Sequence, residues 1–288
     1  MKVANWKDYS VITTGDGYKL ERWAGVTLLR PDPQAIWPAK TDMSSFKGLN
    51  AKYLRSETGG GKWQTYKNFP DEWEISYNNL KFKIKPMGFK HTGLFPEQAV
   101  NWDIMSKLIK NANRPINVLN LFAYTGGATV ACLSAGASVC HVDAAKGMVE
   151  RAGDNVRLSG LKDCPVRFII DDCKKFVQRE IRRGKKYDAI IMDPPSYGRG
   201  PNGEMWKLEA ELYPLVELCK QVLSDDPLFF LINSYTTGLQ PQVIKNILTL
   251  NLRELGGYFN AYDVGLPTED GIVLPCGCSG IWSKEDID

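Results

Sequence analysis

The sequence is poor in side chains that bind metal ions. Its 288 residues include two histidines, His91 and His141, and seven irregularly spaced cysteines. Only Cys276 and Cys278 lie close together, and a zinc site would need two more ligands at a matching spacing. We therefore expect no metal site. The first residues, MKVANWKDYS, lack the apolar stretch of a signal peptide, so we expect a cytoplasmic protein with reduced thiols.

Long hydrophobic runs are also missing. No apolar segment approaches the ~20 residues that a membrane helix needs. The hydrophobic content of 43% and the charged content of 24% are ordinary for a soluble globular protein, so we expect no membrane partner. A length of 288 residues predicts one large domain, or a large domain with a smaller companion.

Negative charge is scarce in the front of the chain. Residues 1–114 contain 18 Lys and Arg against 11 Asp and Glu, whereas residues 115–288 contain 18 against 22. A basic front half favours a polyanionic partner, although a solvated lysine-rich surface would give the same composition.

The sequence divides into two parts with different patterns of predicted secondary structure. Residues 1–88 are expected to form a small β-rich domain: residues 9–31 read as strand, turn, strand, and residues 73–86 read as a hairpin with Asn78 and Asn79 at its turn. Residues 56–65 are expected to form a loop. Residues 89–288 form the second domain, in which apolar strands alternate with amphipathic helices. This alternation predicts an α/β fold with a parallel sheet and helices on both faces.

In such sheets, ligands bind beyond the carboxyl ends of the strands, so the residues that follow each strand are candidates for the site. The strand at 116–122 runs into FAYTGG, which is not the G-x-G-x-x-G of dinucleotide-binding proteins. The next strands end at Asp143, at Asp171 and Asp172, and at Asp193 with two prolines behind it. Each acid has a plain structural alternative, since Asp143, Asp171 and Asp172 can cap helices and the prolines can form a simple turn.

Taken in order, these segments resemble the motifs of a known family. NLFAYTGG, HVDAAKGMVERAGDN, IIDDCKKFV and YDAIIMDPPSYGRG resemble those of the class I S-adenosylmethionine (SAM)-dependent methyltransferases. More narrowly, they resemble the bacterial 23S ribosomal RNA methyltransferases, the branch that includes the cytosine-C5 enzymes. HTGLFPEQ at 91–98 is similar to the segment that these proteins carry before the sheet. The resemblance implies a Rossmann-like sheet of seven strands with helices on both faces, and SAM as cofactor.

The resemblance also implies roles for individual residues. Asp143 would hold the ribose hydroxyls, Asp172 or less favourably Asp171 the adenine amino group, and Gly126 with Gly127 would leave room for the methionyl part. Gln98, with Thr92 as the second candidate, would close the pocket from the segment before the sheet. The full cofactor set is Gln98, Phe122, Ala123, Tyr124, Thr125, Gly126, Gly127, Asp143, Asp171, Asp172 and Asp193. The expected catalytic set is Asp193, Pro194, Pro195 and Tyr197.

The chain departs from the ribosomal RNA methyltransferases in two places. Residues 1–88 do not resemble the PUA domain with which those enzymes usually begin. The stretch after the fifth strand, INSYTTG, has no cysteine where the cytosine-C5 enzymes carry their nucleophile, and Cys276 and Cys278 are expected in a buried closing strand. We therefore do not expect cytosine-C5 chemistry. Transfer to an exocyclic amine or to a guanine ring nitrogen remains open, although Ser196 displaces Tyr197 by one position from the amino-methyltransferase pattern.

The leading hypothesis is a SAM-dependent methyltransferase of RNA, most simply ribosomal RNA. The stretch KFKIKPMGFKH at 81–91 supports it, because lysines can neutralise phosphates while Phe82 and Phe89 stack on bases. The alternatives are a methyltransferase of a protein or small molecule, an NAD-dependent oxidoreductase, and a non-catalytic RNA-binding protein. The sequence gives no indication of the oligomeric state.

Overall fold

The computed structural model describes residues 1–56, 60–88, 90–199 and 205–287. The chain forms two compact units. The large unit contains Val100–Val264 and Gly277–Asp288 together with Met1, and the small unit contains Lys2–Ala99 and Gly265–Cys276. The small unit thus extends past the boundary expected after residue 88 and also takes in a segment from near the C-terminus.

The large unit is built around a parallel sheet, as the alternating pattern predicts. Its strands were expected at nearly these positions: β9 (Asn117–Leu121), β10 (Ser138–Asp143), β11 (Val166–Ile170), β12 (Ala189–Met192) and β15 (Phe229–Ser234). They pair in parallel in the order β15-β12-β9-β10-β11. Burial on both faces explains why these strands read as continuous apolar runs.

Two longer strands close the sheet. β17 (Val273–Ser283) runs antiparallel to β15, and β16 (Tyr258–Pro267) lies beside β17. Among the described residues the sheet has eight strands, because the two-residue strand β1 (Lys2–Val3) adds to the seven expected.

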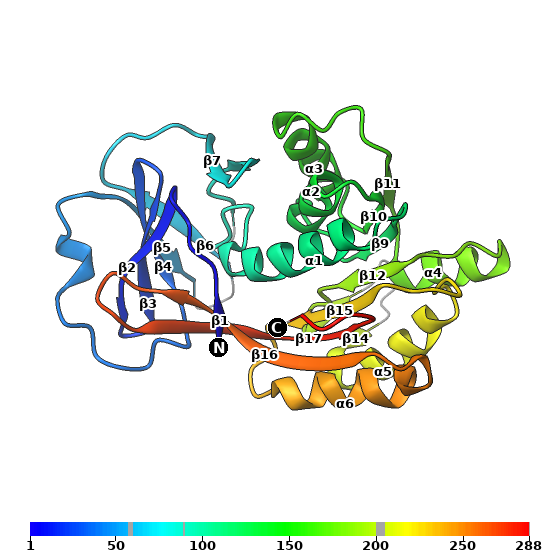
Figure 1. The fold of residues 1–288 in the computed structure, drawn as a ribbon. Helices are drawn as coiled ribbons and strands as arrows, with labels where there is room; N and C mark the ends of the chain where they lie inside the picture. The colour runs from blue at the N-terminus through cyan, green and yellow to red at the C-terminus, as the bar shows by residue number, and fades with distance from the viewer. Residues whose placement is uncertain (57–59, 89, 200–204, 288) are drawn as a thin grey trace. The chain divides into compact units, whose positions relative to one another are not determined.

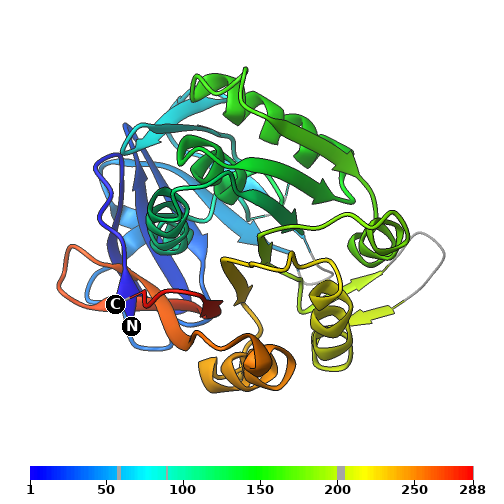
Figure 2. The same ribbon diagram turned by 45° about the vertical axis from the view of Figure 1, so that its right-hand side comes forward.

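Helices cover both faces of this sheet, which confirms the expected layers (Figures 1 and 2). One face carries α1 (Ala99–Asn111), α2 (Gly127–Ser134) and α3 (Lys146–Leu158). The other face carries α4 (Cys173–Arg182), α5 (Leu208–Lys220) and α6 (Pro241–Leu252), followed by the short helix η3 (Arg253–Leu255). The core on this second face joins Leu119, Phe176, Ile190 and Phe230, each at most 1% exposed.

The connections fix where a ligand can bind. From β9 the chain winds through α2, β10 and α3 to β11, and it then returns to place β12 on the opposite side of β9. The strand order therefore reverses between β9 and β12. In parallel α/β sheets, the crevice at this reversal receives the ligand, and the turns that begin at Phe122 and Asp193 flank it.

The small unit contains two sheets. The larger is ordered β2 (Tyr9–Gly15), β3 (Tyr18–Trp23), β4 (Val26–Pro31), β5 (Leu49–Arg55), β6 (Gly61–Thr65), and the smaller is the expected hairpin of β7 (Trp73–Tyr77) and β8 (Leu80–Ile84). Short helices η1 (Met43–Ser45) and η2 (Pro96–Gln98) complete it. The loop expected at 56–65 is wrong for Gly61–Thr65, which pair with β5; residues 57–59 lie outside the described ranges.

A buried ion pair lies in the larger sheet of the small unit. Arg30 donates to both carboxylate oxygens of Glu21, over 2.6 and 2.8 Å, and the Tyr9 hydroxyl donates to the same carboxylate over 2.6 Å. Glu21 is fully buried. Burial alone would raise the pKa of Glu21, but the charges of Arg30 and Lys19 outweigh it and lower this pKa to about 2.

Replacement of Glu21 tests this ion pair. Glu21→Gln leaves Arg30 buried without its counter-charge, so we expect the free energy of unfolding at pH 7 to fall by about 3–5 kcal/mol. The folded-state pKa lies below the unfolded value of about 4.3, so the wild type loses this contribution as the pH falls from 4.3 towards 2. Urea unfolding at pH 7 and pH 3 should therefore show the two proteins converging in acid.

The matched control is Glu269→Gln. Glu269 forms a 2.6 Å pair with Arg22 in the same unit, but both side chains are more than 40% exposed. An exposed pair contributes at most about 1 kcal/mol. Equal losses in the two variants would contradict a stabilising role for burial.

Candidate active site

The turn after β9 has an unusual backbone. Phe122, Tyr124 and Gly126 adopt left-handed conformations, with φ of 53°, 49° and 82°. This conformation costs an L-residue roughly 1–2 kcal/mol, and only Gly126 adopts it freely. Strained turns of this kind persist where surrounding contacts hold them, and they concentrate at functional sites.

Asp143, at the end of β10, holds this turn. One carboxylate oxygen accepts the Tyr124 N–H and the other accepts the Ala145 N–H, each over 2.8 Å. A carboxylate has about four acceptor positions, so two remain for further donors such as the hydroxyls of a ribose. The alternative that Asp143 is the N-cap of α3 is wrong, because Ala145 occupies that position.

The two glycines are required by packing. A Cβ on Gly126 would lie 2.8 Å from the Cβ of Ala152 in α3, and a Cβ on Gly127 would lie 2.6 Å from the indole of Trp102 in α1. Their missing side chains therefore let α3 and α1 approach the turn. That they also leave room for the methionyl part of SAM stays a prediction.

Helix α2 begins directly after the turn, at Gly127. The first amides of a helix have no partner within the helix, and with the helix dipole they favour a negative group such as a carboxylate. Thr125 is buried within the turn, and its carbonyl accepts the side-chain amide of Asn155 over 2.9 Å. Ala123 is buried as well, and its N–H donates to the Val142 carbonyl over 3.1 Å.

The two acids after β11 have structural partners. Asp172 is the N-cap of α4 and accepts the Lys175 N–H over 2.8 Å. Asp171 accepts the Asp172 N–H over 2.9 Å and pairs with Arg179. The capping alternative thus holds for Asp172, whose side chain is also exposed. Contact of either acid with adenine stays a prediction.

A tryptophan joins the turn after β12 to the turn after β9. The Trp206 indole N–H donates to the Pro195 carbonyl over 2.5 Å, and its ring lies 5.5 Å from that of Phe122. Trp206 belongs to β14 (Met205–Lys207), which pairs with β13 (Tyr197–Arg199). Sequence reasoning missed this residue, because nothing in the spacing of the motifs indicates the hairpin.

The members of the Asp-Pro-Pro turn differ in exposure. Pro194 is buried, whereas Pro195 is exposed and Tyr197 is 50% exposed. The Tyr197 hydroxyl lies 3.4 Å from the sulfur of Met205. Asp193 accepts the side-chain amide of Asn233, at the end of β15, over 2.9 Å. Asn233 is a second residue that the sequence did not indicate.

Other expected residues fall in the small unit. Gln98 ends η2, and its N–H donates to the Phe95 carbonyl over 3.1 Å; Thr92 is fully buried. Their role at the cofactor stays a prediction. Phe82 is fully buried, so the expectation that it stacks on a base is wrong, and Phe89 lies outside the described residues. Lys81 and Lys85 are exposed, as a solvated hairpin face requires.

Of the two cysteines in the closing strand, Cys278 is buried and Cys276 is partly buried. Cys278 is 3% exposed, pairs across the sheet with Ser234, and donates to the Leu239 carbonyl over 3.4 Å. Burial raises its pKa to about 11, and burial also raises the pKa of Cys276 well above its usual value. The expectation of burial in the closing strand is therefore confirmed for Cys278.

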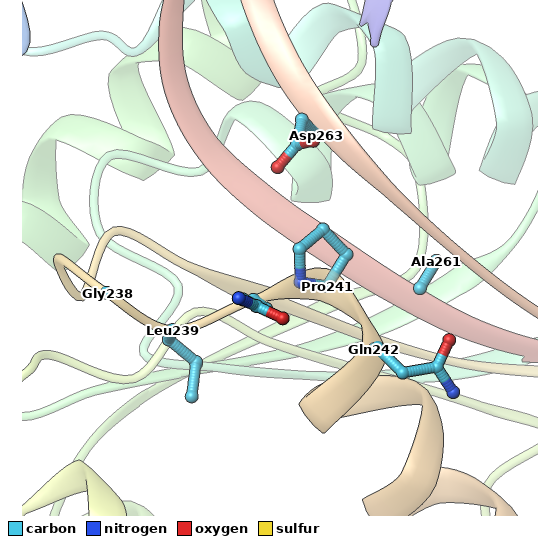
Figure 3. A pocket seen from close by; sticks show the side chains of 7 residues that line it. Gly238, Leu239, Pro241, Gln242, Ala261 and Asp263 are labelled. Atoms are coloured by element: carbon cyan, nitrogen blue, oxygen red, sulfur yellow. The ribbon is translucent and has the colours of Figure 1, made fainter.

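An open hollow of about 590 Å³ lies where α6 meets β16 (Figure 3). It is lined by Gly238, Leu239, Gln240, Pro241, Gln242, Ala261 and Asp263. None of these was expected in the cofactor or catalytic sets. Within the described ranges there is no group of three or more His, Cys, Asp or Glu that could hold a metal ion. No helix in those ranges is long and apolar enough to cross a membrane.

The chain matches a family model for S-adenosylmethionine-dependent methyltransferases over residues 44–218, more than half of its length. It therefore belongs to the SAM-dependent methyltransferases, and SAM is the cofactor of this family. The acceptors of Asp143 and the amides of α2 fit such a ligand. This membership replaces the oxidoreductase alternative.

Relatives with assigned names resemble part of the chain. It is 34% identical to the ribosomal RNA large subunit methyltransferase K/L of Shewanella frigidimarina over 218 residues, which are 73% of this chain and 29% of the relative. It is 35% identical to the ribosomal RNA large subunit methyltransferase I of Tolumonas auensis over 130 residues, 44% of this chain and 32% of the relative. The chain thus spans about a third or less of the length of these relatives.

Among solved structures, a SAM-dependent methyltransferase from Agrobacterium tumefaciens is 32% identical, with a TM-score of 0.91 over 98% of this chain and 92% of that one. The putative methyltransferase SMU.776, solved in complex with SAH, is 16% identical, with a TM-score of 0.75 over 97% of this chain and 76% of that one. The second likeness shows the same fold.

Two alanine variants separate packing from backbone strain in the first turn. Gly126→Ala combines a left-handed φ of 82° with a clash, since the new Cβ lies 2.8 Å from the Cβ of Ala152, whereas Gly136→Ala has a φ of 98° and open space around it. Strain costs about 1–2 kcal/mol in both, and the clash adds about 1–3 kcal/mol in Gly126→Ala alone. We expect the larger loss of melting temperature, and a lost response to SAM, only in Gly126→Ala. Equal losses would remove the packing role.

Asp143→Asn tests the cofactor contact of Asp143. An amide accepts at one atom only, so one of the two backbone N–H groups faces a donor and the ribose loses an ionised partner. We expect SAM affinity to fall about 10–100-fold, as for a lost hydrogen bond to a charged group, measured by calorimetry. Asp263→Asn, in the hollow of Figure 3, should bind SAM normally. The opposite pattern would move the cofactor site to the hollow.

Proposed function

We propose that this protein transfers a methyl group from SAM to a nitrogen atom of RNA, with ribosomal RNA as the first candidate. The observation that carries the proposal is the similarity to a ribosomal RNA large subunit methyltransferase over 73% of the chain. The excess of Lys and Arg in residues 1–114 supports a polyanionic acceptor.

The burial and the raised pKa of the Cys278 thiol favour nitrogen over cytosine C5 as the methyl acceptor. Activation of C5 needs a thiolate that adds to the pyrimidine ring. Cys278, although it lies opposite Ser234 at the end of β15, is buried with a pKa of about 11. A nitrogen lone pair needs no such nucleophile, and correct alignment with the methyl donor supplies most of the rate enhancement.

The residues of the chain then have distinct tasks. Bound SAM supplies the sulfonium methyl. Asp143 and the amides of α2 bind and orient the cofactor, and Trp206 keeps the two turns in register. Asp193 accepts a hydrogen bond from the acceptor group and so aims its nitrogen. Transfer would form the N–CH₃ bond as the S–CH₃ bond breaks, with the proton of the nitrogen passing to solvent and S-adenosylhomocysteine as the leaving group.

Transfer of labelled methyl from SAM tests this function. Unmodified 23S RNA transcripts and large ribosomal subunits should take up label, whereas a protein extract and a small-molecule extract should not. Digestion to nucleosides should place the label on a nitrogen. Asp193→Ala should bind SAM normally but lose at least about 100-fold in turnover, as when an aligning group is removed. Cys278→Ser should keep its activity.

Other outcomes would contradict parts of the proposal. Label only in protein or small molecules would discard RNA. Label on C5 from the wild type, together with a folded but inactive Cys278→Ser, would restore the carbon mechanism. No label in any pool, subunits included, would refute the methyltransferase itself.

A further inference from the structure

The Asp193 carboxylate is the end of a buried chain of hydrogen bonds. The Tyr262 hydroxyl donates to Asn101 Oδ1 over 2.8 Å, and Asn101 Nδ2 donates to Ser279 Oγ over 3.0 Å. The Ser279 hydroxyl donates to Asn233 Oδ1 over 2.9 Å, and Asn233 Nδ2 donates to Asp193 Oδ1 over 2.9 Å. All five residues belong to the large unit.

This chain of hydrogen bonds crosses the core of the large unit. Asn101 lies in α1, Tyr262 in β16, Ser279 in β17 and Asn233 in β15, elements that are labelled in Figure 1. Asn101, Ser279 and Asn233 are at most 1% exposed, and Tyr262 is 8% exposed. Asn233 and Ser279 are direct cross-strand partners in the register of β15 with β17. Polar groups this deeply buried are retained only where they are hydrogen-bonded.

The direction of every bond follows from the carboxylate. An ionised Asp193 can only accept, so Asn233 must turn its NH₂ towards it and its oxygen towards Ser279. Ser279 must then give its single proton to Asn233 and is left as an acceptor for the NH₂ of Asn101. The oxygen of Asn101 therefore faces Tyr262, which donates. Reversal of any amide would place two acceptors or two donors together.

Such a chain is more than a set of stabilising contacts. Hydrogen bonds that run in one direction polarise one another, and here each donor points towards Asp193. The last link fixes one carboxylate oxygen beside the strand reversal between β12 and β9. The side chain is thereby held in one orientation by residues on four other elements.

We propose that Asn233, Ser279, Asn101 and Tyr262 form a positioning network that orients Asp193 towards the methyl acceptor. The inference rests on the proposed function, because it assigns a purpose to the orientation of Asp193. Asn233 is its direct positioning residue, and the other three act through Asn233. The network lies outside the SAM contacts of Asp143 and α2.

Graded removal of the network tests the proposal, with the RNA that takes up label as substrate. Asn233→Leu, Ser279→Ala and Tyr262→Phe break the chain at increasing distances from Asp193. We expect kcat to fall by about 30-fold, 10-fold and 3-fold in that order, as for successively more remote hydrogen bonds. SAM affinity and the KM for RNA should stay within about twofold of the wild type, because the network touches neither.

Tyr187→Phe is the matched control. Tyr187 is 6% exposed and its hydroxyl donates to Glu180 over 2.6 Å, so this variant also loses one buried tyrosine hydrogen bond in the large unit. Comparable losses of melting temperature, with kcat reduced only in Tyr262→Phe, would support the network. Equal kcat values in the two tyrosine variants, with full activity in Ser279→Ala, would overturn it.

A second readout does not depend on activity. In ¹⁵N NMR spectra, the side-chain NH₂ protons of Asn233, assigned by their absence in Asn233→Leu, should exchange slowly with solvent. Their exchange should be faster in Ser279→Ala and Tyr262→Phe, and its rate should be unchanged in Tyr187→Phe. Unaltered exchange in all three variants would refute the chain of hydrogen bonds itself. A wild type that labels no acceptor refutes the proposed function, whereas an active wild type with indifferent variants refutes only the network.

Discussion

The Asp143 carboxylate is the interaction on which the rest of the site depends. It ties the backbone after β9 to the backbone after β10, through Tyr124 and Ala145. This tie helps to hold Tyr124 in its left-handed conformation. The same carboxylate keeps acceptor positions for a ligand, so one side chain both shapes the turn and offers the contact that a ribose needs. A structural role and a binding role are therefore not alternatives here.

The topology of the sheet places this turn beside a second one. Because β12 returns to the opposite side of β9, the FAYTGG turn and the Asp-Pro-Pro turn follow neighbouring strands. Trp206 then joins them, through its bond to Pro195 and its contact with Phe122. The FAYTGG turn and the Asp-Pro-Pro turn are thus linked through one side chain. Movement of the hairpin that carries Trp206 would be felt at both.

The sequence predicted the features that leave a local pattern, and it missed the contacts between residues that are far apart in the chain. β10 and β11 were expected at the residues where they occur, because an apolar run bounded by polar turns is a local signal. The acids at the strand ends were found for the same reason. Asn101 and Ser279 are 178 positions apart, so their hydrogen bond cannot be predicted from the spacing of neighbouring residues. The contact of Trp206 with Phe122 was missed because the hairpin that carries Trp206 contains no recognisable motif. The joining of Gly265–Cys276 to the small unit was missed because it, too, depends on contacts between distant residues.

The position of Cys278 shows why composition near a site does not settle its chemistry. The residue lies opposite Ser234, at the end of the strand where a cytosine-C5 enzyme would need its nucleophile. Yet its thiol donates to the Leu239 carbonyl and is almost fully buried, and burial raises its pKa to about 11, which favours the protonated thiol at pH 7. Asp193, by contrast, is held by a charged-acceptor bond from Asn233. Cys278 is therefore unsuited to supply the nucleophile that methylation of a carbon needs, and the oriented Asp193 supports the proposal of a nitrogen acceptor.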